Sequence, residues 1–248
     1  MGKNRYSNKG VNSAARNSQA AAAAAQEKAQ MRAVVISAVA VLLVVLALVL
    51  VFALQEVNMT AIQAEIDSME VEDFVETDKT TGYVKITVKD HGDIIVRLRK
   101  DIAPITVKNF QKLVGQKFYD GLTFHRIYKG FMIQGGDPKG DGTGGSGTTI
   151  KGEFEKNGVT NDLSHVTGVI SMARRSTPYD SATSQFFICN ANASASLDGS
   201  YAGFGYVVAG LDTVMSISDV EVTANSDGEK SQPLSPVVIE SIRFVEKK

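Results

Sequence analysis

An uncharged, apolar run of 22 residues, from Ala33 to Leu54, limits what this chain can fold into more than any other feature. Ser37 is the only polar side chain in the run. As a helix, at ~1.5 Å per residue, the run would be about 33 Å long, which matches the ~30 Å hydrocarbon core of a bilayer. A soluble protein would have to surround such a helix completely, and neither flank could do so. The run therefore predicts a transmembrane helix.

A cleaved signal peptide is the alternative to a permanent membrane helix. The apolar core of a signal peptide has only ~7–15 residues, so the run is longer than such a core requires. A cut at Val51-Phe52-Ala53 would nevertheless release the rest of the chain. Six Lys and Arg residues precede the run, and a series of acidic residues follows it, beginning with Glu56. Because positive flanks remain in the cytoplasm, we expect a single-pass protein of the cell membrane with residues 55–248 outside.

Charge divides the rest of the chain into three segments. Residues 1–32 carry six Lys or Arg and one Glu, and their Ala- and Asn-rich composition predicts a disordered cytosolic tail. Residues 55–82 carry eight Asp or Glu and one Lys, which predicts an acidic stalk. The alternative for this stalk is a helical stripe for self-association, formed by Met59, Ile62, Ile66 and Met69. Residues 83–248 carry 19 basic and 18 acidic residues, so they lack the basic surface typical of nucleic-acid binding.

From Tyr83 onward, apolar and polar residues alternate in short runs, which predicts β-strands. The predicted strands cover residues 84–88, 94–98, 123–127, 131–134, 167–172, 185–190, 204–208 and 236–245. One helix is predicted after Pro104, with Thr106 as its cap and Gly115 as its end, and a second at residues 211–217. Eight short strands and two helices indicate a mainly β fold, a closed antiparallel β-barrel capped by two helices.

The predicted barrel contains no arrangement typical of covalent or metal-assisted catalysis. Its three histidines are far apart in sequence, and neither Ser171 nor Ser184 stands in a glycine elbow. The glycine-rich run 143–147 lacks the Lys-Ser/Thr ending of a phosphate-binding loop. The single cysteine, Cys189, excludes an internal disulfide, a cysteine zinc site and a CxxC pair.

Two long motifs carry the information about function. They read Phe-His-Arg-Ile-Tyr-Lys-Gly-Phe-Met-Ile-Gln-Gly-Gly-Asp at residues 124–137 and Ser-Gln-Phe-Phe-Ile-Cys at residues 184–189. With these motifs in this order and spacing, residues 83–245 resemble the cyclophilin-type peptidyl-prolyl cis–trans isomerases in their bacterial form. The resemblance implies an eight-stranded barrel with two helices, isomerisation of X–Pro bonds in proteins and peptides, and neither cofactor nor metal.

The resemblance also implies roles for individual residues. Arg126 would be the catalytic arginine, and Gln134 would hold the substrate backbone. His125 would lie beside the proline pocket, either in catalysis or as a hydrogen-bonded structural histidine, and His91 and His165 are expected to be structural. The other implied substrate-binding residues are Phe131, Met132, Phe187 and Leu197 around the proline, and Ala173, Arg174, Gln185 and Tyr201 along the groove and rim.

Three positions depart from the best-known eukaryotic pattern of this family. Ser196 stands in place of a tryptophan, Tyr201 in place of a histidine, and Arg174 in place of an asparagine, with Arg175 beside it. None of these changes removes the catalytic arginine. We expect Ser196 to weaken the binding of cyclosporin-like inhibitors, and we expect the other two positions to bear on substrate preference.

The sequence therefore predicts a membrane-anchored enzyme that isomerises X–Pro bonds in proteins folding outside the membrane. Two alternatives use the same fold. One is a binding module that holds proline-containing segments without catalysis, and the other is a structural membrane protein that assembles through its tail or stalk. The intact set Arg126, Phe131, Gln134 and Phe187 favours the enzyme.

Overall fold

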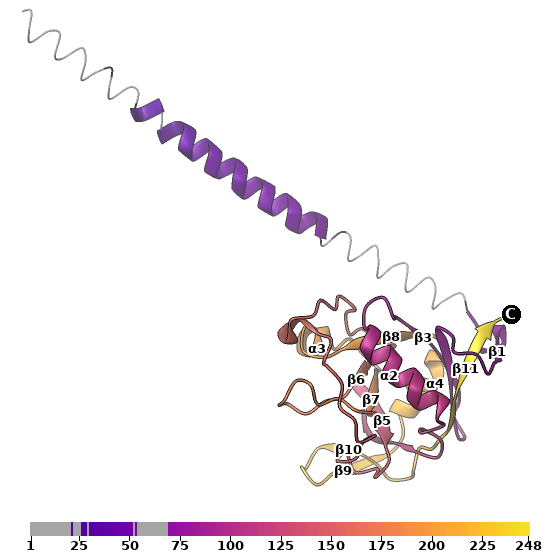
Figure 1. The fold of residues 1–248 in the computed structure, drawn as a ribbon. Coiled ribbons are helices and arrows are strands. Elements are labelled where there is room, and N and C mark those ends of the chain that lie inside the picture. The colour runs from indigo at the N-terminus through magenta and orange to yellow at the C-terminus, as the bar shows by residue number, and fades with distance from the viewer. Residues whose placement is uncertain (1–20, 22–25, 29, 52, 54–68) are drawn as a thin grey trace, which may run out of the picture. The chain divides into compact units, whose positions relative to one another are not determined.

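The computed structural model describes residues 21, 26–28, 30–51, 53 and 69–248. The chain divides into two compact units, Met1–Ile62 and Gln63–Lys248. In the first unit, the helix Gln26–Val51 is long and apolar enough to cross a membrane, and none of its apolar window is buried (Figure 1). The predicted span 33–54 is therefore helical up to Val51. Most of the predicted tail, positions 52 and 54, and the stripe residues Met59, Ile62 and Ile66 lie outside the described part of the chain.

The second unit is built on a nine-stranded antiparallel sheet with the order β1-β11-β2-β3-β8-β6-β7-β5-β4. Its strands are β1 (Phe74–Glu76), β2 (Tyr83–Val88), β3 (Gly92–Leu98), β4 (Thr123–Tyr128), β5 (Met132–Asp137), β6 (Val169–Met172), β7 (Phe186–Cys189), β8 (Gly203–Ala209) and β11 (Ile239–Lys247). All eight predicted strands are present, and the fold is mainly β, as predicted.

The last strand of the sheet order, β4, and the second strand, β11, lie next to each other where both begin. The backbone N–H of Phe124 donates to the carbonyl of Val237 over 2.9 Å, and the N–H of Ile239 donates to the carbonyl of Leu122 over 2.7 Å. These bonds bring the last strand of the sheet order next to the second, as a barrel requires.

Two further strand features were not predicted. Residues 70–82 belong to the expected stalk, yet the short 3₁₀ helix η1 (Val71–Asp73) and strand β1 form here, and β1 pairs with β11 from Phe74↔Lys247 to Glu76↔Val245. The sheet therefore begins before Tyr83. A separate two-stranded hairpin, β9 (Val222–Ala224) and β10 (Lys230–Pro233), contacts β4 through β10 and is drawn at the lower edge of Figure 1.

The helices of this unit are α2 (Pro104–Gly115), α3 (Ser194–Leu197) and α4 (Leu211–Ser218), with a 3₁₀ turn η2 (Glu155–Asn157). Helix α2 ends at Gly115, as predicted, but Thr106 is not its cap. The N-cap is Ala103, and it makes no side-chain cap bond. Instead, the buried carboxylate of Glu153 accepts the backbone N–H groups of Ile105 (3.0 Å) and Thr106 (2.8 Å). A residue distant in sequence thus satisfies the free donors of this helix end.

Strand alternation divides the apolar residues between the two faces of the sheet. Ile127 pairs with Ile133, Ile133 with Ile188, and Ile188 with Ile170, so one row crosses β4, β5, β7 and β6. All four side chains are buried in the main core, with Phe110 of α2. Because side chains alternate along a strand, the neighbouring residues of this row must point to the opposite face.

Candidate active site

The row next to the four isoleucines carries the residues that the sequence motifs single out. Arg126 lies opposite Gln134 in the β4–β5 pair, and Gln134 lies opposite Phe187 in the β5–β7 pair. Directly opposite residues of antiparallel strands project from the same face at short range. The sheet register therefore brings a cation, an amide and an aromatic ring together on the outer face of three adjacent strands.

All three nitrogens of the Arg126 guanidinium have named partners. Nε donates to Glu229 Oε2 over 2.6 Å and Nη2 donates to Glu229 Oε1 over 2.7 Å, a bidentate pair. Nη1 donates to Gln134 Oε1 over 3.3 Å and lies 3.9 Å from Met132 Sδ. One edge of the planar group, formed by Nε and Nη2, is thus fixed by a carboxylate, and the third nitrogen, Nη1, faces the side chains of β5.

The hairpin β9–β10 supplies Glu229, which the sequence motifs do not indicate. The amide oxygen of Asn225 accepts the backbone N–H groups of Asp227 (3.0 Å) and Glu229 (2.9 Å), which tightens the turn. Ser231 donates its hydroxyl to Glu229 Oε2 over 2.7 Å. The hydrogen bonds from Arg126 lower the pKa of the Glu229 carboxyl, so the group is ionised at neutral pH.

Beside Arg126, a second group of apolar residues lies apart from the main core. We call it the outer apolar cluster. Its buried members are Met132, Phe187, Cys189, Ala193 and Leu197, and Phe131, Ala173 and Tyr201 pack against them partly buried. The cluster thus unites three predicted substrate-binding residues of β5, β7 and α3, which are Met132, Phe187 and Leu197, with three others, Phe131, Ala173 and Tyr201. Cys189 and Ala193 were not predicted, and burial raises the pKa of the Cys189 thiol to about 12.

His165 supports the aromatic wall of the outer apolar cluster. Its ring stacks on Phe187 with centroids 6.1 Å apart and planes 24° apart. Nδ1 contacts Asp198 Oδ1 at 2.8 Å and Nε2 contacts Ser171 Oγ at 2.9 Å, so the ring is held at both nitrogens. Tyr201 meets the Phe187 ring edge-on at 5.8 Å.

His125 is a partly buried residue of β4. It stands at a register shift between Phe124 and Arg126, where β4 departs from regular pairing with β5. Both of its ring nitrogens are buried and make no side-chain hydrogen bond among the described residues, and both readings of His125, catalytic and structural, stay predictions. Burial lowers the pKa of the ring, which favours the neutral imidazole. Contact of His125 with substrate stays a prediction.

A polar groove continues from Gln134. Gln134 Nε2 donates to Gln185 Oε1 over 2.9 Å, and Gln185 Nε2 donates to the carbonyls of Gly142 (3.0 Å) and Gly144 (2.8 Å). These bonds tie the glycine-rich loop to the site. The groove has a volume of about 680 Å³, and both glutamines, Ala173 and Arg174 line it.

The described residues contain no group of three or more His, Cys, Asp or Glu side chains that could hold a metal ion. The side chains that the structure places at this site are a fixed cation, two amides and an apolar surface.

Comparisons with known proteins agree with the resemblance seen in the motifs. A sequence profile described as "Cyclophilin type peptidyl-prolyl cis-trans isomerase/CLD" matches residues 83–244. Peptidyl-prolyl cis-trans isomerase B of Bacillus subtilis (strain 168) is 44% identical over 142 residues, which are 57% of this chain and 93% of that protein. Peptidyl-prolyl cis-trans isomerase B of Escherichia coli (strain K12) is 39% identical over 164 residues, covering 63% and 96%.

A solved structure is also similar. It is a cyclophilin-type peptidyl-prolyl cis-trans isomerase of Cryptosporidium parvum, determined in the presence of the dipeptide Ala-Pro. The TM-score is 0.58 and the identity 30%, over 65% of this chain and 98% of that chain.

Proposed function

Because the chain belongs to the cyclophilin-type peptidyl-prolyl cis–trans isomerase family, and is an enzyme of that class, we propose that Arg126 is its catalytic residue. The X–Pro bond has a rotation barrier of ~18–20 kcal/mol, because the nitrogen shares its lone pair with the carbonyl. In the twisted transition state that lone pair is localised on nitrogen. A hydrogen-bond donor held at the nitrogen therefore stabilises the transition state more than the planar ground state.

Nη1 of Arg126 is the donor best suited to this role. Nε and Nη2 are both bound by Glu229, whereas Nη1 shares only a 3.3 Å bond with Gln134 and a long contact with Met132. The second proton of Nη1 is thus available for a substrate. Glu229 acts as a positioning residue, because its two short bonds fix the plane of the guanidinium before the substrate arrives.

The surrounding groups would hold the two sides of the bond. We propose that the outer apolar cluster receives the proline ring, and that Gln134 bonds to the substrate backbone. Rotation then occurs about a bond whose proline side is clamped, and no covalent intermediate or metal is needed. The observation that carries this proposal is the row Arg126–Gln134–Phe187, with Arg126 fixed by Glu229.

A proline-peptide isomerisation assay of the full-length chain in detergent tests the proposal. Arg126→Ala should lower kcat/KM by about 10²–10³, the usual effect of removing one preorganised donor. Arg126→Lys should also be slow, because lysine keeps the charge but loses the planar fork.

The matched control is Arg243→Ala. Arg243 forms an equivalent bidentate pair with Asp120 (2.8 and 2.7 Å), but it belongs to β11 and lies outside the proposed site. Circular dichroism should find every variant folded. Near wild-type activity in folded Arg126→Ala would refute the catalytic role of Arg126, whereas a folded wild-type chain without activity would favour the binding module.

We further propose that the apolar part of the helix Gln26–Val51 anchors the enzyme in the cell membrane, with residues 1–32 in the cytoplasm. The six cations before the apolar run and the acids after it support this orientation. The substrates would then be X–Pro-containing proteins that fold outside the membrane.

For inhibitors, we infer that cyclosporin-like molecules bind weakly. The chain has no tryptophan, and the Ser196 hydroxyl bonds within α3 to the Ala193 carbonyl over 3.0 Å. Serine offers neither the apolar face nor the indole donor of a tryptophan. A titration of Ser196→Trp should give tighter inhibitor binding than wild type, and equal affinities would contradict this inference.

A further inference from the structure

The groove beside Gln134 and Gln185 carries three cationic side chains and no acidic one. Lys139, Arg174 and Arg175 line it together with the two glutamines. The remaining lining residues are glycine, threonine, serine and alanine, which leave the walls polar and uncharged. The groove thus presents an excess of positive charge next to the proposed catalytic arginine.

None of these three cations forms an ion pair within the described part of the chain. Lys139 Nζ donates to the Thr143 hydroxyl at 3.4 Å. Arg174 donates to three backbone carbonyls, those of Ser200 (2.8 Å), Arg175 (2.8 Å) and Ser176 (3.1 Å). Arg175 is exposed, and its backbone rather than its guanidinium bonds to Ser181. Arg174 and Arg175 thus have no carboxylate partner among the described residues, whereas Lys139 interacts electrostatically with Asp141.

Two acidic residues in the loop that carries Lys139 are already occupied by hydrogen bonds. The buried carboxylate of Asp137 accepts backbone N–H groups of Lys139 (2.9 Å), Asp141 (3.2 Å) and Gly142 (2.6 Å). Asp141 is bound by the backbone and hydroxyl of Thr143 (2.8 and 2.7 Å). Both carboxylates thus stabilise the turn that carries Lys139, and neither forms an ion pair with it, although Asp141 feels its charge.

Arg174 is also fixed in place. Its guanidinium carbon lies 4.6 Å from the ring centroid of Tyr201, 4.9 Å from that of Phe154 and 5.0 Å from that of Tyr179. Cation–π contacts and three carbonyl bonds keep the charge at the wall of the groove, so a ligand meets it without ordering a flexible chain.

We propose that this groove binds an acidic side chain, Asp or Glu, of the substrate segment that flanks the isomerised proline. The inference rests on the proposed function and names its substrate class. Gln134 contacts Arg126 at one end and Gln185 in the groove at the other, so the groove adjoins the proposed reaction site directly. An extended chain advances ~3.3–3.6 Å per residue, so side chains within a few residues of the proline can reach it.

Proline peptides that differ at one position test the proposal with the full-length chain in detergent. Glu, Gln and Lys are placed in turn at each of the three positions before and after the proline. At the position that reaches the groove, kcat/KM should follow Glu > Gln > Lys. The Glu peptide should exceed its neutral isostere Gln by about three- to tenfold, the range for a few exposed ion pairs. The preference should nearly vanish at 1 M salt, where the Debye length is ~3 Å.

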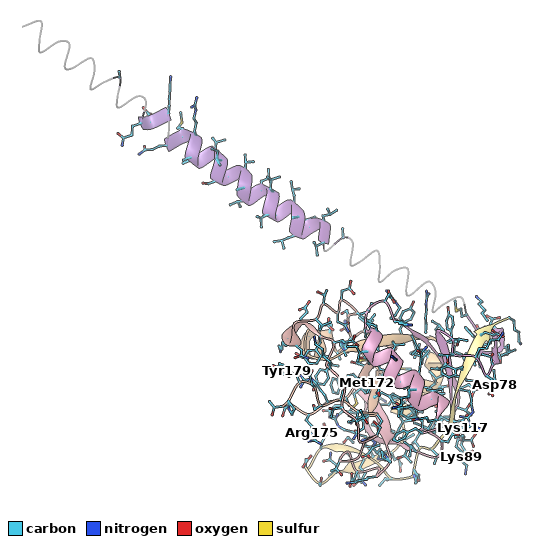
Figure 2. The ribbon with its side chains drawn as sticks, viewed as in Figure 1. Asp78, Lys89, Lys117, Met172, Arg175 and Tyr179 are labelled. Atoms are coloured by element: carbon cyan, nitrogen blue, oxygen red, sulfur yellow. The ribbon has the colours of Figure 1, made fainter. Side chains whose placement is uncertain are left out.

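Charge-reversal variants test whether the cations of the groove cause the preference for the Glu peptide over the Gln peptide. For each of the variants Arg175→Glu and Lys139→Glu, kcat/KM is measured with the Glu peptide and with the Gln peptide. The ratio of the two values should fall to one or below. Lys89→Glu is the matched control, because Lys89 is exposed and does not line the groove. Figure 2 labels Lys89 on the right of the domain, and Arg175 and Tyr179 on the left. This control should keep both the activity and the wild-type ratio.

The outcomes separate the two proposals. Equal rates for the Glu, Gln and Lys peptides at every position, or a ratio that charge reversal leaves unchanged, would overturn the acidic groove alone. Failure of every peptide to be isomerised would overturn the proposed function, and the acidic groove with it.

Discussion

At the scale of single residues, the Arg126–Glu229 pair orients the Arg126 guanidinium more than it stabilises the fold. The two side chains are 31% and 28% exposed, so water screens their attraction and its contribution to folding is small. The bidentate geometry is different in kind, because two parallel bonds fix the plane of a guanidinium as well as its position. Glu229 therefore bears on the rate of reaction through the orientation of Arg126.

Glu229→Gln should lower kcat about tenfold while changing KM less, because the amide has one acceptor where the carboxylate has two. The pKa of Glu229 lies below its ordinary value of 4.5. The carboxylate is consequently present at all pH values above 4.5 and is lost only as the pH falls through the lower folded value. In stopped-flow assays between pH 8 and pH 4, protonation of Glu229 should therefore not lower the kcat of the wild type until the pH falls below 4.5.

The control for this variant is Glu221→Gln. Glu221 is exposed and lies just before the same hairpin, and it should keep wild-type kcat at every pH. An unchanged kcat in Glu229→Gln would show that the Arg126–Glu229 pair has no effect on the rate, and a higher kcat would show that it slows the reaction. Either result would contradict the positioning role of Glu229.

Which site residues the sequence could predict depends on how close they are to the motifs. Phe131, Met132 and Phe187 lie in the motifs, and strand register brings them together. Glu229 is 103 residues away from Arg126 and stands in a polar turn that resembles any surface hairpin. Glu229 belongs to the site only because β10 packs against β4, and no pattern in the nearby sequence predicts that contact.

At the scale of elements, alternation predicted the strands that have one face in the core. It failed for β1 and for β9 and β10, which have three or four residues each and too few apolar positions to show a period. The predicted cap of α2 failed for a related reason. Thr106 is a favourable capping residue in sequence, but its N–H and hydroxyl both donate to Glu153 (2.8 and 2.7 Å), a residue of a distant loop.

Glu153 should therefore be a large single contributor to the stability of this unit. Glu153→Ala should lower the free energy of unfolding of residues 69–248 by about 2–4 kcal/mol, because it leaves buried N–H donors of α2 unsatisfied. Glu153→Gln should cost less, about 1–2 kcal/mol, since one amide oxygen can still accept a bond. Urea denaturation followed by circular dichroism measures both values.

Glu155→Ala serves as the comparison, since Glu155 is exposed in η2 only two residues away. Its effect should stay within about 0.5 kcal/mol, the usual range for surface substitutions. If Glu153→Ala were equally mild, the cap of α2 would have to come from elsewhere.

At the scale of the whole molecule, the sequence places all of its enzyme chemistry in one unit and its membrane-compatible helix in the other. Every residue of the candidate site lies after Gln63, in the second unit, and the apolar helix Gln26–Val51 lies in the first. Charged residues cost ~2.5–3.5 kcal/mol at the centre of a membrane helix, so the uncharged run is the segment suited to remain in the bilayer.

Protease added to intact cells or spheroplasts should thus digest an epitope at Lys248 and spare one at Met1. The N-terminal epitope should stay on the mature chain, because an uncleaved anchor keeps it, whereas a signal peptide would carry it away. A fragment of residues 69–248, which retains β1 on β11, should be soluble and active. Protection of the Lys248 epitope would reverse the proposed orientation and remove the basis for substrates outside the membrane.

The burial of Cys189 has a practical consequence for measuring this protein. The chain's only thiol is enclosed in the outer apolar cluster, and its pKa of about 12 leaves almost no reactive thiolate at neutral pH. A cysteine introduced on the surface, for example at Lys89, can therefore take a fluorophore while the native thiol stays unlabelled. The wild-type sequence is in this sense already suited to single-site labelling, so the movement of the enzyme relative to a membrane can be followed without first replacing a residue of its own site.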